Sequence, residues 1–174
     1  MDIKKLTAKQ KVKLVMGADF WTNYDLDGAI YKFVVSDGPV GLRQPIDRTT
    51  TEQHDCIKSV AYPSFQMLSQ TWDTALAYKM GKSLGNDCIE QKVDILLAPG
   101  VNIKRLPTCG RNFEYLSEDP LIAGEFAKEY IEGVQSMHVG TALKHYCANN
   151  CERSRHWISS EVDERTLREI YIKP

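Results

Sequence analysis

One pattern occurs three times along this chain: a short apolar run, then a polar or irregular stretch, then a segment with helical spacing. The apolar runs are residues 31–35, 93–98 and 141–147. Strands that run parallel need long crossover connections, usually helical, whereas antiparallel strands can be joined by two-residue turns. The repetition therefore predicts an α/β fold, in which about three strand–helix units form a parallel sheet.

Helical spacing is clearest in two segments. In the first, every fourth residue from Trp72 to Cys88 is apolar, and Thr71 or Asp73 can cap a helix that ends near Gln91. In the second, Asp119-Pro120 has the form of an N-cap followed by an N1 proline, and the apolar face consists of Ile122, Phe126, Tyr130 and Val134. Both segments are long enough to cross over between strands.

Two shorter helices are predicted near the ends of the sequence. A capping box from Thr7 to Gln10 begins the first, and Gly17 ends it. The second covers 163–171, with Leu167 and Ile170 facing inward. The polar stretch 44–62, between the first strand and its helix, shows little periodicity and is expected to be a long excursion.

Polar side chains follow each predicted strand: Asp37 after the first, Asn102 after the second, and Lys144-His145 after the third. This is the polarity of a (β/α)8 TIM-type barrel, whose site lies at the carboxyl ends of the strands. A doubly wound sheet is the alternative, although no GxGxxG follows any strand, which disfavours its dinucleotide-binding version. A closed barrel takes roughly 250 residues. The chain of 174 residues therefore reads either as a small open α/β domain or as one portion, 1–174, of a larger barrel without a second domain.

Composition excludes several classes of partner. With 22 basic and 23 acidic side chains, there is no electrostatic argument for nucleic acid or an anionic membrane. No apolar run approaches the roughly 18 residues of a membrane span, and three lysines between positions 9 and 13 interrupt any export signal. Five cysteines without CxxC pairs favour a reducing, cytoplasmic location. A small neutral ligand, without metal or cofactor, is expected.

Four sequence blocks carry a resemblance to a known family. They are SDGPVGLR at 36–43, LAPGVNIKRLPTCGRNFEYLSEDP at 97–120, ALKHYCANNCERSR at 142–155, and VDERTLREIYIKP at 162–174. In this order they resemble the signature blocks of family 3 glycoside hydrolases, in the β-glucosidase-like branch. The resemblance covers most of the chain. It implies the N-terminal part of a (β/α) barrel whose pocket receives the terminal sugar of a β-glycoside, which is cleaved with retention.

The resemblance also implies which residues bind the sugar: Asp37, Arg43, Arg111, Lys144, His145 and Arg155. The chemistry suits a pyranose, because a carboxylate accepts hydrogen bonds from hydroxyls and cationic side chains donate them. Structural roles are the alternative for several of these residues. Asp37 can simply form a turn, and the arginines can pair with nearby carboxylates, Arg111 with Glu114 or Glu118 and Arg155 with Glu152.

Adjacent residues of a strand point to opposite faces, so Lys144 and His145 reach one pocket only if the backbone is distorted. The resemblance implies a cis or strained peptide bond at this pair. Retaining glycosidases also need two carboxyl groups about 5 to 5.5 Å apart. In the family both come from later segments that this sequence does not contain, and Glu114, Glu118 and Glu152 are not expected to substitute.

We therefore expect no catalytic residue in this chain and little turnover by the chain alone. A β-glucoside is the predicted ligand, and the remainder of the barrel, in cis or in trans, is the predicted partner. Exposed sheet edges favour self-association as a homo-oligomer. Two alternatives stay open: a non-catalytic sugar-binding or regulatory remnant, and a small open α/β domain that shares only sequence blocks with the family.

Overall fold

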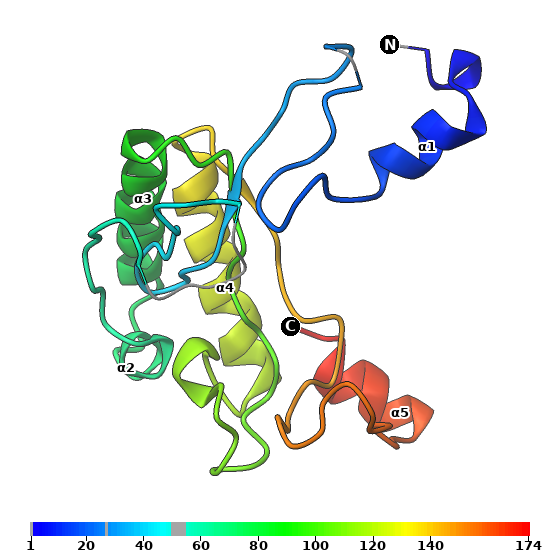
Figure 1. Ribbon diagram of the computed structural model, residues 1–174. Helices are drawn as coiled ribbons and strands as arrows, with labels where there is room; N and C mark the ends of the chain where they lie inside the picture. The colour runs from blue at the N-terminus through cyan, green and yellow to red at the C-terminus, as the bar shows by residue number, and fades with distance from the viewer. Residues whose placement is uncertain (1, 27, 50–54) are drawn as a thin grey trace.

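The computed structural model describes residues 2–26, 28–49 and 55–174. Its sheet has three parallel strands in the order β1-β2-β3: Val35–Ser36, Ile95–Leu96 and Gly140–Thr141 (Figure 1). Val35 lies opposite Ile95, and Ile95 lies opposite Gly140. The predicted α/β class, with parallel strands joined by helical crossovers, is confirmed.

The strands are shorter than predicted, with two residues each in place of 31–35, 93–98 and 141–147. One cause is visible before β1, where the N–H of Val34 donates to the Asp94 carboxylate at 2.8 Å and not to a neighbouring strand. Another follows β2, because Pro99 has no N–H for a ladder. Pairing resumes further on at an isolated parallel bridge between Gly100 and Lys144.

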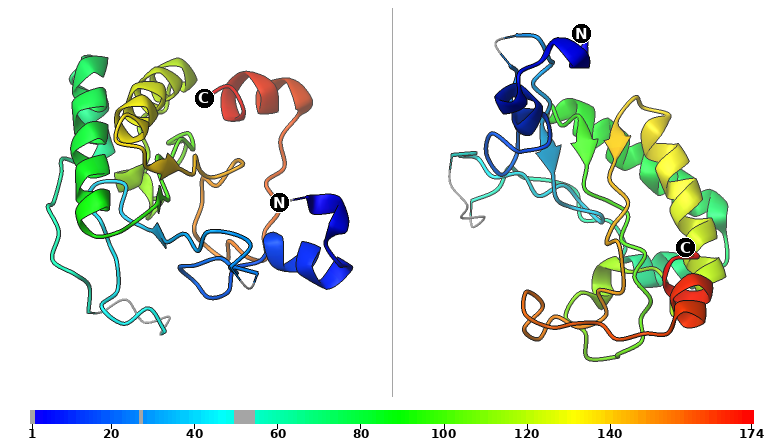
Figure 2. Two further views of the ribbon diagram at one scale, coloured as in Figure 1. Left: turned by 90° about the horizontal axis from the view of Figure 1, so that it is seen from above. Right: turned by 90° about the vertical axis from the view of Figure 1, so that its right-hand side faces the viewer.

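Two long helices, α3 (Thr74–Glu90) and α4 (Pro120–Gln135), lie side by side on one face of the sheet (Figure 2). They approach closely through glycines: a Cβ at Gly81 would lie 2.2 Å from the carbonyl oxygen of Tyr130. Asp119 caps α4 by accepting from the N–H groups of Leu121 and Ile122, and Pro120 is its first residue. The prediction for α4 is confirmed.

Asp73, one of the two predicted caps, begins α3, and the predicted end near Gln91 is confirmed. Asp73 accepts from the N–H of Ala75 at 3.0 Å, so the helix begins at Thr74. Trp72 therefore lies outside it, with a φ of 58° and a side chain that is 77% exposed. The apolar spacing continues into the core only from Met80 onward.

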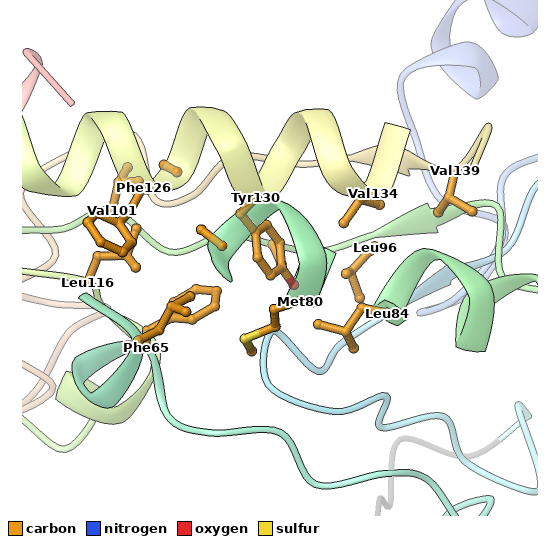
Figure 3. Close-up of a cluster of buried hydrophobic side chains, with 14 of the residues drawn as sticks. Phe65, Met80, Leu84, Leu96, Val101, Leu116, Phe126, Tyr130, Val134 and Val139 are labelled. Atoms are coloured by element: carbon orange, nitrogen blue, oxygen red, sulfur yellow. The ribbon is translucent and has the colours of Figure 1, made fainter. Parts of the chain in front are cut away.

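The core lies between these two helices and the sheet (Figure 3). Tyr130 is fully buried there, with its ring edge against Phe65 at a centroid distance of 5.1 Å. Its hydroxyl donates to the carbonyl oxygen of Pro39 at 2.9 Å. One buried side chain thus ties helix α4 to the turn that follows β1.

A further helix, α2 (Phe65–Ser69), was not predicted. Ser64 caps it by accepting from the N–H of Met67, and Phe65 and Leu68 point into the core. The signal was present as a serine followed by two apolar residues three positions apart, but one turn and a half of helix is too short for a clear period.

The helices at the two ends of the chain contain no buried residue. The 3-10 turn η1 (Ile3–Lys5) and helix α1 (Ala8–Leu14) lie apart from the α3–α4 layer. The predicted capping box of α1 is present. Near the other end, α5 (Glu164–Thr166) continues as the π-helical turn η3 (Leu167–Tyr171), in which the predicted inward residues are only half-buried.

Of the predicted excursion 44–62, residues 50–54 lie outside the described residues. Within the part of the chain that the structure describes, no helix has the length and apolar character needed to cross a membrane.

Candidate functional site

A cavity of about 500 Å³ opens among the segments that follow the three strands. Its lining includes five of the six residues predicted to bind a sugar: Asp37, Arg43, Arg111, Lys144 and Arg155. Asp37 comes directly after β1, Arg111 lies in the excursion after β2, and Lys144 lies after β3. Parallel strands bring these distant segments to one edge of the sheet, which is where ligands bind in α/β folds.

Glycines shape the turn that carries Asp37. The N–H of Arg43 donates to the carbonyl oxygen of Asp37 at 2.9 Å, which closes the turn. Gly38 and Gly41 have φ values of 118° and 140°, which side-chain-bearing residues rarely adopt. A Cβ at Gly38 would also lie 2.1 Å from the carbonyl oxygen of Gly41. Asp37 is therefore both part of a turn and part of the cavity wall, and the two interpretations of this residue are compatible.

Glu114 is the buried acidic residue of the site, and sequence reasoning underestimated it. Only 3% of it is exposed. One carboxylate oxygen is paired with Nε of Arg111, and the other lies 3.2 Å from Nζ of Lys144. The 3-10 turn η2 (Asn112–Glu114) places Glu114 beside Arg111, three residues earlier. The structural pairing of Arg111 is thus present, and Arg111 lines the cavity as well.

Charge balance fixes the ionisation of Glu114. Burial alone would raise its pKa, but the hydrogen bond from Arg111 and the charges of Lys144 and Arg111 outweigh burial, so the pKa is lowered from its ordinary value. Glu114 is therefore a carboxylate that holds two cations, and it has no proton to give as a general acid. The ammonium of Lys144 is also 3.8 Å from the carboxylate of Asp37, which links the first and third strand ends.

Lys144 and His145 are joined by a cis peptide bond, as the sequence comparison with the family predicted. Lys144 lines the cavity, but His145, which is also among the described residues, does not. Instead, Nδ1 of His145 lies 3.0 Å from Oδ1 of Asn102 and 3.1 Å from the hydroxyl of Tyr115. A sugar contact by His145 stays a prediction.

Burial, together with the charges of Arg111 and Lys144, lowers the pKa of His145 to about 4. The imidazole is therefore neutral at physiological pH. Burial raises the pKa of Tyr115 to about 12, so its hydroxyl keeps its proton.

The last part of the cavity wall is a polar cluster around Glu152. Arg155 pairs with Glu152 at 3.1 Å, as the structural alternative predicted, and both side chains line the cavity. The amide of Asn149 donates to Glu152 at 3.1 Å and to the hydroxyl of Tyr115 at 3.0 Å. These contacts connect the loop after β3 to the segment after β2. The contact between Asn149 and Tyr115 was not predicted, because the two residues are 34 positions apart in sequence.

The cavity is thus a charged, mostly pre-paired site, with four cationic and three acidic side chains in its lining. Lys144 forms ion pairs with Asp37 and Glu114, and Asp37 is the most exposed of the three, with 37% of its side chain accessible. It can accept hydrogen bonds from a ligand while Lys144 and the arginines donate. Such a set suits a hydroxyl-rich, neutral molecule.

Fold and site together define an α/β domain with a polar pocket at the carboxyl ends of parallel strands. Residues 29–174 match the family model described as the glycosyl hydrolase family 3 N terminal domain. The chain belongs to this family.

Characterised relatives agree with this assignment. The chain is 45% identical over 172 residues to a thermostable beta-glucosidase B from Acetivibrio thermocellus, and 41% identical over 173 residues to an exo-alpha-(1->6)-L-arabinopyranosidase from Bifidobacterium longum. Each alignment covers 98% of this chain but only 23% of the relative. The chain thus spans about a quarter of the length of these proteins.

The fold is shared with solved enzymes. Beta-glucosidase 3B from Thermotoga neapolitana, in a structure with glucose, superposes with a TM-score of 0.86 at 39% identity. The superposition covers 98% of this chain and 26% of that enzyme.

Proposed function

We propose that this chain forms the donor-sugar side of the pocket of a retaining β-glycosidase and binds the terminal sugar of a β-glucoside. One observation carries the proposal: Asp37, Arg111 and Lys144, from three different strand ends, line a single cavity. The glucose present in the structure of the Thermotoga neapolitana relative supports the same class of ligand.

The cavity suits one sugar ring in size and in chemistry. Its volume of about 500 Å³ lies within the usual range of small-molecule pockets. Asp37 would accept from two neighbouring hydroxyls, while Lys144, Arg43, Arg111 and Arg155 would donate. Hydrogen bonds with a charged partner are about twice as strong as neutral ones, so a few such contacts would orient a neutral sugar.

Hydrolysis would need groups from outside this chain. Glu114 and Glu152 are engaged by Arg111 and Arg155, so neither is free to act as nucleophile or acid/base. We infer that the remaining strands of the barrel, in cis or in trans, supply both catalytic carboxyl groups. Among the described residues, the third strand has a sheet neighbour on one side only, which leaves an edge where a further strand would pair.

A second sugar is a candidate because the arabinopyranosidase from Bifidobacterium longum is nearly as similar as the beta-glucosidase B. Arabinopyranose is a pyranose without the exocyclic hydroxymethyl group of glucose. The charged groups around Asp37 would serve either ring, so this part of the pocket binds the hydroxyls that the two sugars share.

Thermal unfolding with increasing glucose tests the proposal. Bound ligand stabilises a protein by RT ln(1 + [L]/Kd), about 2.7 kcal/mol at a hundredfold excess over Kd, so we expect the melting temperature of the chain to rise with glucose. Asp37→Asn should abolish the rise. The matched control is Asp47→Asn, an exposed loop residue, which should keep it.

A melting temperature that does not respond to glucose or to arabinose, or an Asp37→Asn variant that responds like the parent, would contradict sugar binding at this site. Incubation with an aryl β-glucoside tests the second half of the proposal. Robust hydrolysis by the chain alone would show that it contains its own catalytic pair.

A further inference from the structure

The side-chain amide of Asn102 forms two hydrogen bonds with the backbone of His145. Its Nδ2 donates to the carbonyl oxygen of His145 at 3.0 Å, and its Oδ1 accepts from the N–H of His145 at 3.1 Å. Turning the amide over would set donor against donor and acceptor against acceptor at both points. Because Asn102 is only 3% exposed, water cannot relieve such a mismatch. The position of Oδ1 is therefore fixed by the backbone.

The same oxygen faces the imidazole ring. Oδ1 of Asn102 lies 3.0 Å from Nδ1 of His145. An amide oxygen can only accept, so the contact is a hydrogen bond only when Nδ1 carries the proton. We propose that Asn102 is a positioning residue that holds His145 as the neutral Nδ1–H tautomer, which leaves Nε2 as an unprotonated acceptor.

Tyr115 offers the rival account, because its hydroxyl lies 3.1 Å from the same nitrogen. In that case the hydroxyl would donate to an unprotonated Nδ1. This would leave the lone pairs of Nδ1 and Oδ1 facing each other at 3.0 Å. A hydroxyl hydrogen can rotate to suit its partner, whereas the Asn102 amide cannot turn over. The fixed amide oxygen of Asn102 therefore determines that Nδ1 carries the proton. The Tyr115 oxygen then acts as a second acceptor, which also accepts a hydrogen bond from the amide of Asn149.

The charges around the ring support a neutral imidazole. Burial, Arg111, Lys144 and Arg155 all disfavour a second proton, and Glu114 alone among the groups that act most strongly on the ring favours it. The consequence for the ligand rests on the proposed function. Lys144 and the arginines can only donate hydrogen bonds, whereas His145, which lies beside the cavity lining and not in it, would offer a neutral acceptor to a sugar hydroxyl that reaches Nε2. Replacing that hydroxyl by a group that cannot donate would lose this contact.

Long-range proton–nitrogen NMR on the histidine-labelled chain reads the tautomer directly, in the absence of sugar. The chain has four histidines, and the His145→Gln variant identifies the signals of the one concerned. We expect the parent chain to show a protonated Nδ1 and an unprotonated Nε2 at pH 7. Asn102→Leu, which removes the acceptor with little change in volume, should shift the proton to Nε2 in part or completely.

Two variants separate Asn102 from Tyr115. Tyr115→Phe should leave the Nδ1–H form unchanged, and so should the control Asn86→Leu, whose amide donates to Glu90 on helix α3. A parent chain with the proton on Nε2 would overturn the proposal. So would a tautomer that changes in Tyr115→Phe but not in Asn102→Leu.

Asn102→Asp keeps the experiment decisive if Asn102→Leu does not fold. The carboxylate has the same shape and still accepts from Nδ1–H, although its second oxygen replaces the amide donor that faces the carbonyl oxygen of His145. Its charge favours the imidazolium, so the NMR titration midpoint of His145 should rise by about one to three pH units. A midpoint equal to that of the parent would refute contact between the two groups. These spectra are recorded without sugar, so a failure of glucose binding would not affect the tautomer result. Conversely, if the chain binds glucose but His145 carries its proton on Nε2, only this inference is refuted and the proposed function stands.

Discussion

Glu114 offers the sharpest test of how the pocket is held together. Replacing it by glutamine preserves shape but removes the charge that lies between Arg111 and Lys144. Breaking a buried ion pair by removing one partner costs about 3–5 kcal/mol. Here the side chains of the two cations are 20% and 16% exposed, so water recovers part of the loss. We expect Glu114→Gln to lower the free energy of unfolding by about 2–3 kcal/mol.

Urea denaturation followed by circular dichroism measures this change. For a chain of this size, the loss corresponds to a fall in melting temperature of about 5–10 °C. The control is Glu132→Gln, whose carboxylate is half-exposed and lies 3.9 Å from Lys128 on the surface of α4. Exposed pairs at this spacing contribute about 0.3–0.5 kcal/mol, so the control should differ little from the parent.

The effect should depend on pH in one direction. The pKa of Glu114 in the folded chain is below its ordinary value of 4.5. A depressed carboxyl pKa stabilises the folded state above the unfolded pKa, and this stabilisation is lost as the pH falls through the folded value. The difference between parent and Glu114→Gln should therefore be full near pH 7 and shrink as the pH falls below 4.5. Equal stability at pH 7, or a difference that stays constant down to pH 3, would refute the reasoning.

Two further predictions concern the packing that supports the site. Tyr130→Phe removes the hydrogen bond to the carbonyl oxygen of Pro39 and should destabilise the chain by about 1–3 kcal/mol, because it leaves a buried acceptor unpaired; urea midpoints equal to those of the parent would contradict this. Gly81→Ala would set a Cβ 2.2 Å from a backbone oxygen of α4 and should force α3 and α4 apart, with a loss of several kcal/mol. Gly124→Ala is its control, since its nearest contact is 3.4 Å away, and a similar loss in both variants would argue against tight helix contact.

Much of the fold follows from local signals. Three helices were predicted from such signals: two from the caps Thr7 and Asp119, and one from the apolar residue at every fourth position up to Cys88. These signals depend only on neighbours within about one helical turn. For the third of these helices the local signals left two caps open, Thr71 and Asp73. Trp72 continues the apolar period, but Asp73 is the cap and the helix begins after it.

Strand lengths were not predictable, because they depend on what the backbone meets across the sheet. The N–H of Val34, just before β1, donates to the Asp94 carboxylate. No pattern within residues 31–35 predicts this contact. The residues of the pocket were available from the family blocks, but their connections were not. Glu114 reaches Lys144, and Asn102 reaches His145, across 30 and 43 residues of chain that only folding brings together.

The separation between core and pocket has a consequence for how such a domain can change. The buried cluster comes from α2, α3, α4 and the sheet, whereas the segment 151–160, which carries Glu152 and Arg155, has no buried residue. Substitutions in that loop can therefore retune the charge offered to a ligand at little cost to folding. Under the proposed function, a change in the preferred sugar would therefore require substitutions in this loop and none in the helical layer.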